Sequence, residues 1–183
     1  MQDDLPRSGG GHAHPPAILV MGVSGSGKTT IGSALAARLG YRFQDADDLH
    51  PPGNRAKLAA GVPLTDADRA PWLDAVGAWL AAARAGGDGA VVACSALKRR
   101  YRERLQAAAP GMRIVHLDLP RDVLAQRMAH RRGHFMARSL LDDQLATLEP
   151  PGEDEGAIRV RPLGPVAETV AGLVAALATD GSG

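Results

Sequence analysis

The sequence predicts an α/β protein in which helices cover both faces of a parallel sheet. Short apolar runs of the kind that buried strands require alternate with segments of helical periodicity along most of the chain. The first run, residues 17–21, leads into a glycine-rich loop and then into a helical stripe formed by Ile31, Leu35 and Leu39. Strands joined through helices pair in parallel, so we expect three layers in α/β/α order.

The remaining elements follow from the same periodicities. We expect further strands at residues 41–44, 90–94, 114–117 and 157–160, and helices at 55–60, 66–85, 98–102, 120–131, 139–148 and 166–178. The clearest helix starts after Thr65, which we expect to cap it together with Asp68. Residues 49–54 contain two prolines and a glycine and predict a break in regular structure, as do residues 132–135.

Length and composition indicate one globular domain. We expect it to span residues 17–178, with a disordered extension at 1–16 and a flexible tail at 179–183. Hydrophobic residues make up 45% and charged residues 22% of the 183, and the formal net charge of +1 provides no field that would attract nucleic acid or a membrane surface. The single cysteine, Cys94, excludes an intramolecular disulfide. We find no secretory signal pattern and no apolar run long enough to span a bilayer, so we expect a cytoplasmic protein.

The glycine-rich loop has the spacing G-x-x-x-x-G-K-[ST], which is the phosphate-binding P-loop. Glycines let consecutive main-chain N–H groups point inward around an anion, and the helix that follows adds its positive dipole end. Lys28 is expected to reach the β- and γ-phosphates, and the Thr29 hydroxyl to bind Mg²⁺. The predicted nucleotide-binding residues are Gly22, Val23, Ser24, Gly25, Ser26, Gly27, Lys28, Thr29 and Thr30. The alternative, a glycine turn that binds nothing, is disfavoured by the flanking strand and helix.

Two carboxylates follow the second predicted strand. Many P-loop enzymes hold Mg²⁺ with an aspartate that ends a central strand, but the strand at 90–94 ends in Cys94. Asp45 and Asp47 lie instead at the carboxyl end of the strand at 41–44, the edge where ligands bind in such sheets. We predict that Asp45 serves the metal and that Asp47 accepts the proton of an attacking hydroxyl, the alternative being two solvated loop acids.

Four further segments resemble the bacterial-type gluconate kinases. They are D-x-D-x-L-H-P at 45–51, P-L-x-D-x-D-R-x-P-W-L at 63–73, C-S-A-L-K at 94–98 and G-H-F at 133–135. In this order they are specific, and the resemblance spans residues 17–178. It implies a P-loop NTPase fold of the shikimate and nucleoside-monophosphate kinase type, ATP and Mg²⁺ as cofactors, and a homodimer. The implied reaction is ATP-dependent phosphorylation of D-gluconate to 6-phospho-D-gluconate.

A polyhydroxy carboxylate needs a cation and several polar partners. The residues that we predict to bind it are Asp47, His50, Asn54, Lys57, Lys98 and His134. Three of them have a plainer alternative: His50 packs its loop, His134 closes a lid, and Lys98 caps its helix. Cys94 is expected to be a small buried strand residue rather than a nucleophile.

By resemblance, Arg127 and Arg131 have the placement of lid arginines in related kinases, which implies a short lid around residues 127–138. One such cation stabilises the charge on the transferred phosphoryl group, and by resemblance the other stacks on adenine. We name Arg131 as catalytic and Arg127 as nucleotide-binding, although the sequence alone does not divide these roles, and the alternative is a pair of solvated surface charges. Gln144 and residues 161–162 are weaker candidates.

Two other functions fit part of the pattern. A kinase of the same fold that acts on a shikimate-like hydroxy acid needs the same loop and carboxylates. A non-catalytic ATP-binding regulatory protein needs only the loop, and the combination of two aspartates with two arginines argues against it. A nucleoside-monophosphate kinase is disfavoured, because the predicted acceptor region is rich in His, Asn and Lys rather than in apolar and aromatic side chains.

Overall fold

The computed structural model describes residues 16–129 and 134–179, and in these residues it contains one parallel sheet. The strands are β1 (Ala17–Met21), β2 (Arg42–Asp45), β3 (Ala90–Ala93), β4 (Arg113–Leu117) and β5 (Ile158–Val160). Their order is β2-β3-β1-β4-β5, and every neighbouring pair is parallel. The predicted three-layer α/β/α fold is confirmed.

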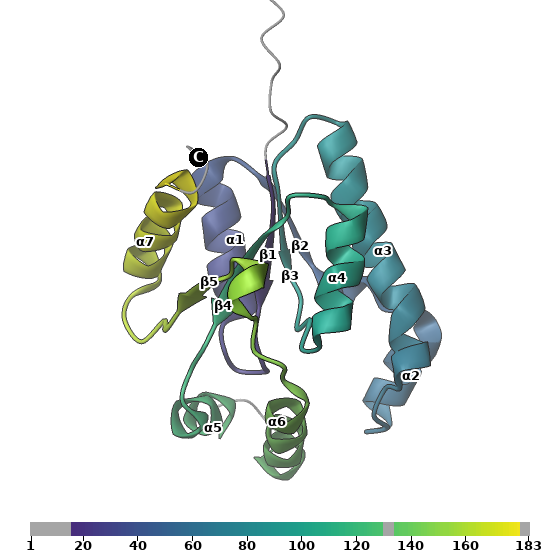
Figure 1. Ribbon diagram of the computed structural model, residues 1–183. Helices are drawn as coiled ribbons and strands as arrows, with labels where there is room; N and C mark the ends of the chain where they lie inside the picture. Colours follow the sequence, from purple (N-terminus) through teal and green to yellow (C-terminus); the bar gives the residue numbers. More distant parts are fainter. Residues whose placement is uncertain (1–15, 130–133, 180–183) are drawn as a thin grey trace, which may run out of the picture.

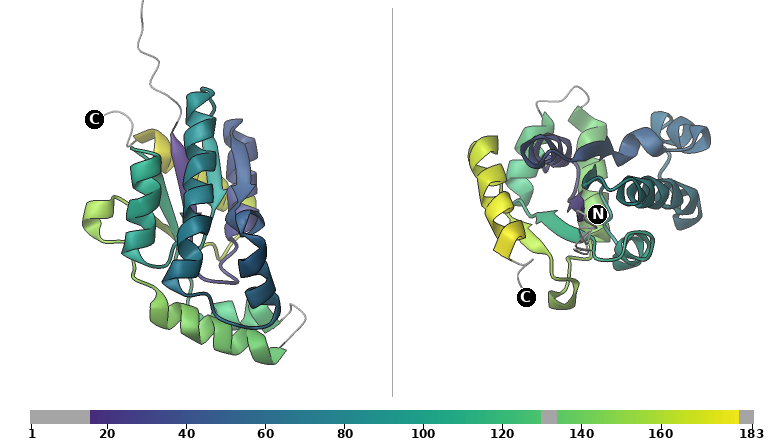
Figure 2. Two further views of the ribbon diagram at one scale, coloured as in Figure 1. Left: turned by 90° about the vertical axis from the view of Figure 1, so that its right-hand side faces the viewer. Right: turned by 90° about the horizontal axis from the view of Figure 1, so that it is seen from above.

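Helices enclose the sheet on both faces and along its carboxyl edge (Figures 1 and 2). They are α1 (Lys28–Leu39), α2 (Pro52–Ala59), α3 (Asp66–Ala85), α4 (Arg99–Ala108), α5 (Arg121–Ala129), α6 (His134–Thr147) and α7 (Val166–Thr179), with short 3₁₀ helices η1 (Ala46–Leu49) and η2 (Glu153–Glu155). Helices α1 and α7 cover one face, and α3 and α4 cover the other. Helices α5 and α6 lie beyond the carboxyl ends of the strands (Figure 1). In the described part of the chain, no helix is both long and apolar enough to cross a membrane.

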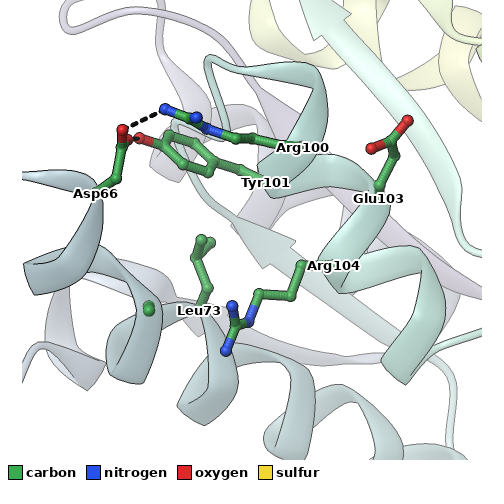
Figure 3. Close-up of a pocket in the computed structure, with 7 residues that line it drawn as sticks. Asp66, Leu73, Arg100, Tyr101, Glu103 and Arg104 are labelled. Atoms are coloured by element: carbon green, nitrogen blue, oxygen red, sulfur yellow. Dashed lines mark hydrogen bonds and ion pairs between the residues drawn. The ribbon is translucent and has the colours of Figure 1, made fainter.

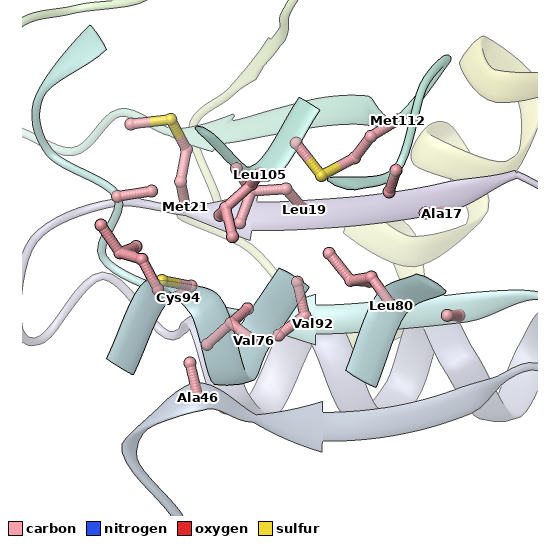
Figure 4. Packing of buried hydrophobic residues seen from close by; sticks show 14 of the residues in the cluster. Ala17, Leu19, Met21, Ala46, Val76, Leu80, Val92, Cys94, Leu105 and Met112 are labelled. Atoms are coloured by element: carbon pink, nitrogen blue, oxygen red, sulfur yellow. The ribbon is translucent and has the colours of Figure 1, made fainter. Parts of the chain in front are cut away.

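The buried strand β1 supplies both layers of the core because its side chains alternate. Leu19 and Met21 pack with α3 and α4 in the cluster that Figure 4 shows, whereas Ile18 and Val20 pack against α1 and α7. A third cluster joins Val23 of the P-loop to α5 and α6. The phosphate-binding loop is therefore held between the sheet and the two helices at its edge.

The structure corrects two of the predicted breaks. Residues 49–54 are not irregular throughout, because α2 begins at Pro52. Proline fits the first helical position, where its missing N–H would have no partner in the helix. The predicted interruption at 132–135 is too long, since α6 already begins at His134. The cap of α3 is confirmed: Thr65 and Asp68 form a reciprocal capping box.

Candidate active site

The P-loop runs from the end of β1 to the start of α1 and is shaped by glycines in left-handed or unusual conformations. Gly27, the N-cap of α1, has φ 95°. Gly22 has φ 151°, and a Cβ on it would lie 2.9 Å from the main-chain oxygen of Leu117. Side chains at these two positions would strain the loop or push it away from β4. The loop thus keeps its main-chain N–H groups at the N-terminus of α1, where an anion is favoured.

Lys28 is the first residue of α1, and its ammonium group folds back over the loop. Lys28 Nζ donates to the carbonyl oxygen of Val23 over 3.1 Å. This keeps a positive charge beside the main-chain nest, as the phosphate-binding role requires.

Thr29 and Asp45 form the part of the site that suits a magnesium ion. Thr29 Oγ1 donates to Asp45 Oδ2 over 2.6 Å, and Asp45 Oδ1 accepts from the main-chain N–H of Asp47 over 3.0 Å. A hydroxyl and a carboxylate are the oxygen ligands that Mg²⁺ prefers, and this ion keeps several waters and takes few protein ligands. No group of three or more His, Cys, Asp or Glu side chains in the described residues offers an alternative metal cage. The residues present therefore fit Mg²⁺ bound jointly with phosphates.

Asp47 lies on η1, one turn beyond the end of β2. Although 85% of its side-chain surface is exposed, its pKa is raised above the usual 3.8. The larger cause is loss of hydration among the surrounding groups, and the charge of Asp45 adds to it, whereas Lys28 and His50 oppose it. A carboxylate with a raised pKa beside Lys28 is suited to accept a proton.

His50 lines the site as a buried side chain that its neighbours hold in place. It is 6% exposed and stacks on Trp72 with ring centroids 4.3 Å apart. Its Nδ1 lies 3.4 Å from Asn54 Nδ2, and its Nε2 lies 3.9 Å from Asp47 Oδ1. Burial lowers the pKa of His50, and Arg69 and Arg55 add to this effect while Asp47 opposes it. The imidazole is therefore kept neutral and directed at Asp47, which brings these two predicted site residues together.

Lys57 and Lys98, both predicted to bind the substrate, already have carboxylate partners. Lys57 Nζ lies 2.6 Å from Asp68 Oδ1, and Lys98 Nζ lies 3.1 Å from Asp66 Oδ1. The buried Asn54 donates to the main-chain oxygen of Asp68 over 2.8 Å. These three side chains hold the start of α3 in place, and their predicted contacts with substrate remain predictions.

Arg69 is a cation that the sequence analysis did not assign. It is half-buried near the start of α3, and among the described residues its guanidinium has no carboxylate within ion-pair distance. Its charge acts on the pKa of both His50 and Tyr101, so it lies near both. One signal was available, because an arginine near the positive end of a helix dipole is locally unfavourable and therefore suggests a function.

Arg127 and Gln144 contact the P-loop from α5 and α6. Arg127 Nη1 donates to the main-chain oxygen of Ser26 over 3.5 Å, and its Nη2 donates to that of Pro162 over 2.6 Å. Gln144 Oε1 accepts from the N–H of Ser24 over 2.6 Å. Arg131 and the side chain of His134 lie outside the described residues.

Cys94 follows the last residue of β3 and is buried. It is 1% exposed, and burial raises the pKa of its thiol to about 12. The thiol is thus protonated and unsuited to act as a nucleophile, in agreement with the sequence analysis.

A surface pocket of about 480 Å³ lies between α3 and α4 (Figure 3). Asp66 accepts hydrogen bonds from Tyr101 and Arg100, and its pKa falls to about 2, mainly through the bonds from Tyr101 and Lys98. Arg104 on the opposite wall is paired with Asp74. The charged groups of this pocket are already matched, so the candidate active site is the edge that carries the P-loop and Asp47.

Comparison with known proteins gives consistent matches. A family model described as an AAA domain matches residues 18–151. The gluconokinase of Gluconobacter oxydans is 55% identical over 146 residues, which cover 80% of this chain and 82% of that protein. The crystal structure of a gluconokinase from Sinorhizobium meliloti has a TM-score of 0.80 at 48% identity and covers 91% of this chain and 93% of its own. Shikimate kinase from Aquifex aeolicus, at 17% identity and a TM-score of 0.56 over 91% of this chain and 99% of its own, shares the fold.

Proposed function

Because the chain belongs to the gluconokinase family and catalyses ATP-dependent phosphorylation of gluconate, we propose which of its residues carry each part of that reaction. The observation that carries the assignment is the meeting of Lys28, Asp45 and Asp47 at one end of the sheet. Thr29 connects the P-loop with the aspartates, since it follows Lys28 in the chain and donates to Asp45. A phosphate site and a candidate base thus adjoin each other.

On the nucleotide side, the P-loop amides and Lys28 hold the triphosphate. Thr29 and Asp45 hold Mg²⁺, which neutralises charge on the phosphate oxygens when it is bound. We assign Arg127 to the nucleotide rather than to the acceptor; in support, its guanidinium donates to the main-chain oxygens of Ser26 in the P-loop and of Pro162 after β5. Arg131 remains our choice for the cation that stabilises the transferred phosphoryl group.

On the acceptor side, Asp47 accepts the proton of the attacking hydroxyl, which we assign to the 6-position of D-gluconate. The oxygen forms its bond to the γ-phosphorus while the bond to the β–γ bridging oxygen breaks, leaving ADP. His50 orients Asp47 and presents a polar edge to the sugar hydroxyls, together with Asn54. Lys57, Lys98 and His134 complete the polar wall.

We add Arg69 as the partner of the gluconate carboxylate. Lys57 and Lys98 are each matched by an aspartate, whereas the half-buried guanidinium of Arg69 has no carboxylate partner among the described residues. An arginine can bind a carboxylate with two parallel hydrogen bonds, which also orients it.

A coupled ADP-release assay over gluconate, shikimate, glycerate and nucleoside monophosphates tests the function. We expect turnover with gluconate, and we expect Lys28→Ala to abolish it while the protein stays folded. Ser33→Ala, an exposed change on the same helix, is the matched control. Turnover of shikimate instead would favour the related hydroxy-acid kinase, and ATP binding without ADP release would favour the regulatory protein.

We also propose that the enzyme works in the cytoplasm. By family resemblance we expect it to be a homodimer. Sedimentation velocity at several protein concentrations tests the dimer, and a single species of monomer mass would contradict it.

A further inference from the structure

Arg102 of α4 is a buried cation that none of the assigned roles uses. Its side chain is 1% exposed, and it forms two hydrogen bonds with Glu155, itself 9% exposed, over 2.5 and 2.8 Å. A buried arginine needs a carboxylate and well-placed acceptors to offset its lost hydration. The third nitrogen, Nη1, donates to main-chain oxygens, so each guanidinium nitrogen has a hydrogen-bond partner.

Those acceptors lie mainly in the β3–α4 loop, residues 94–98. Arg102 Nη1 donates to the carbonyl oxygens of Ala96 over 3.2 Å and Leu97 over 3.3 Å, and also to that of Glu149 over 3.0 Å. The loop leaves the carboxyl end of β3 between the strands that carry the P-loop and Asp45, and it ends at Lys98. Arg102 is therefore hydrogen-bonded to the loop that leads from β3 to Lys98, a predicted substrate residue.

The β3–α4 loop contains one residue in an unfavourable backbone conformation. Ala96 has φ +40°, and no other non-glycine residue in the described part of the chain has a positive φ. It is fully buried. Such a conformation persists only where neighbouring groups over-determine it, and it is most common at ligand-binding sites. The hydrogen bond from Arg102 to the carbonyl of Ala96 is one of those constraints.

The segment after α6, residues 149–155, contacts this loop through Glu149 and contacts Arg102 through Glu155. The Glu149 N–H donates to the Leu97 carbonyl over 2.9 Å, and the Glu149 carboxylate accepts from the Arg99 N–H over 2.6 Å. Glu155 also accepts from the main-chain N–H of Gly152 over 3.0 Å. Hydrogen bonds thus join residues 149–155 to the β3–α4 loop, both directly and through the guanidinium of Arg102.

We propose that Arg102, held by Glu155, is a positioning residue that sets the conformation of the β3–α4 loop for binding of the sugar-acid acceptor. The inference rests on the proposed function, because it takes this loop as part of the acceptor site. Arg102 itself touches neither acceptor nor nucleotide. Its loss should therefore weaken acceptor binding selectively.

The test is steady-state kinetics of Arg102→Lys, which keeps the charge but removes the planar fork that spans Glu155 and the carbonyls. We expect the KM for gluconate to rise about tenfold, as small misplacements of binding groups do, with the KM for ATP unchanged. Arg104→Lys is the matched control, since Arg104 lies on the same helix and makes a two-bond pair with Asp74 at the surface. We expect it to match the wild type.

Glu155→Gln provides a second variant that leaves Arg102 in place, and we expect the same selective rise in acceptor KM. If Arg102→Lys fails to fold, the acceptor KM of Glu155→Gln tests the inference in its place. A purely structural role would lower the melting temperature and the folded fraction while leaving acceptor KM unchanged, and this result would overturn the inference but not the proposed function. If the wild type used another sugar acid, the comparison would be made with that acceptor. Wild-type protein that phosphorylates no sugar acid would refute both.

Discussion

Thr29 and Asp45 are joined by a hydrogen bond of 2.6 Å although sixteen positions separate them in the chain. Thr29 belongs to the first turn of α1, and Asp45 is the last residue of β2. The two strands that lead to them are not neighbours, because β3 lies between β1 and β2. The contact therefore crosses the carboxyl edge of the sheet and places the oxygen atoms that we assign to Mg²⁺ beside the phosphate nest.

Asp45→Asn should weaken the response to magnesium, because an amide oxygen carries no charge to attract the ion. We expect the Mg²⁺ concentration that gives half-maximal rate to increase about tenfold or more. A magnesium titration of initial rates at saturating ATP and gluconate measures this. Asp88→Asn, which changes an exposed aspartate paired with Arg42, should leave the titration unchanged. An unaltered requirement in Asp45→Asn would remove Asp45 from the metal site.

Asp47→Asn should lower kcat by about 10²- to 10⁴-fold, because the proton acceptor is lost while the shape of the side chain is kept. The KM for ATP should change little. Asp48→Asn, a neighbouring exposed carboxylate, is the control. Equal kcat values for Asp47→Asn and the wild type would exclude Asp47 as the base.

The same carboxylate predicts the pH dependence of the wild-type rate. Asp47 must be ionised to accept a proton, and its pKa is raised by loss of hydration and by the charge of Asp45. The rate should therefore fall as the pH decreases through this raised pKa, at a higher pH than an ordinary aspartate would give. A kcat profile without an acidic limb above the usual aspartate range would contradict this assignment.

Arg69→Met should impair recognition of the carboxylate while keeping much of the apolar length of the side chain. We expect the KM for gluconate to rise by about tenfold to a hundredfold, the loss typical of a charge-assisted hydrogen-bonded pair. The preference for gluconate over a neutral polyol of the same length should shrink with it. Arg38→Met, on the exposed end of α1, should affect neither quantity. An unchanged preference would mean that another group binds the carboxylate.

His116 should make the protein less stable in mild acid. It is 2% exposed on β4, its Nδ1 has no partner among the described groups, and burial lowers its pKa from 6.5 more than Asp118 raises it. The unfolded chain then binds the proton at a higher pH than the folded chain does. The free energy of unfolding must fall as the pH decreases from about 6.5 to the lower folded-state pKa.

Melting temperatures measured between pH 8 and pH 5 test this prediction. His116→Gln should show a shallower decline than the wild type, although His50, whose pKa is also lowered, keeps part of the effect. Parallel curves for the two proteins would show that His116 does not contribute.

Local patterns predicted most of the elements. The capping box at Thr65 and Asp68 and the buried strand β1 depend on residues close together in the chain, and both are found as expected. The start of α2 differs from the predicted break, because a proline can begin a helix as well as end one, and Pro52 begins this one. Arg69 was missed because no local pattern shows which cation lacks a partner.

By itself, the sequence determined the alternation of strands and helices, the phosphate-binding loop and the two aspartates at the carboxyl end of β2, because each follows from the spacing of neighbouring residues and from the order of parallel strands. Only the tertiary structure decided how the charges pair. Lys57 with Asp68, Lys98 with Asp66 and Arg102 with Glu155 join residues 11, 32 and 53 positions apart. Such pairs form where packed elements bring their side chains together, and the free energy of an ion pair depends on distance and burial that no spacing along the chain specifies.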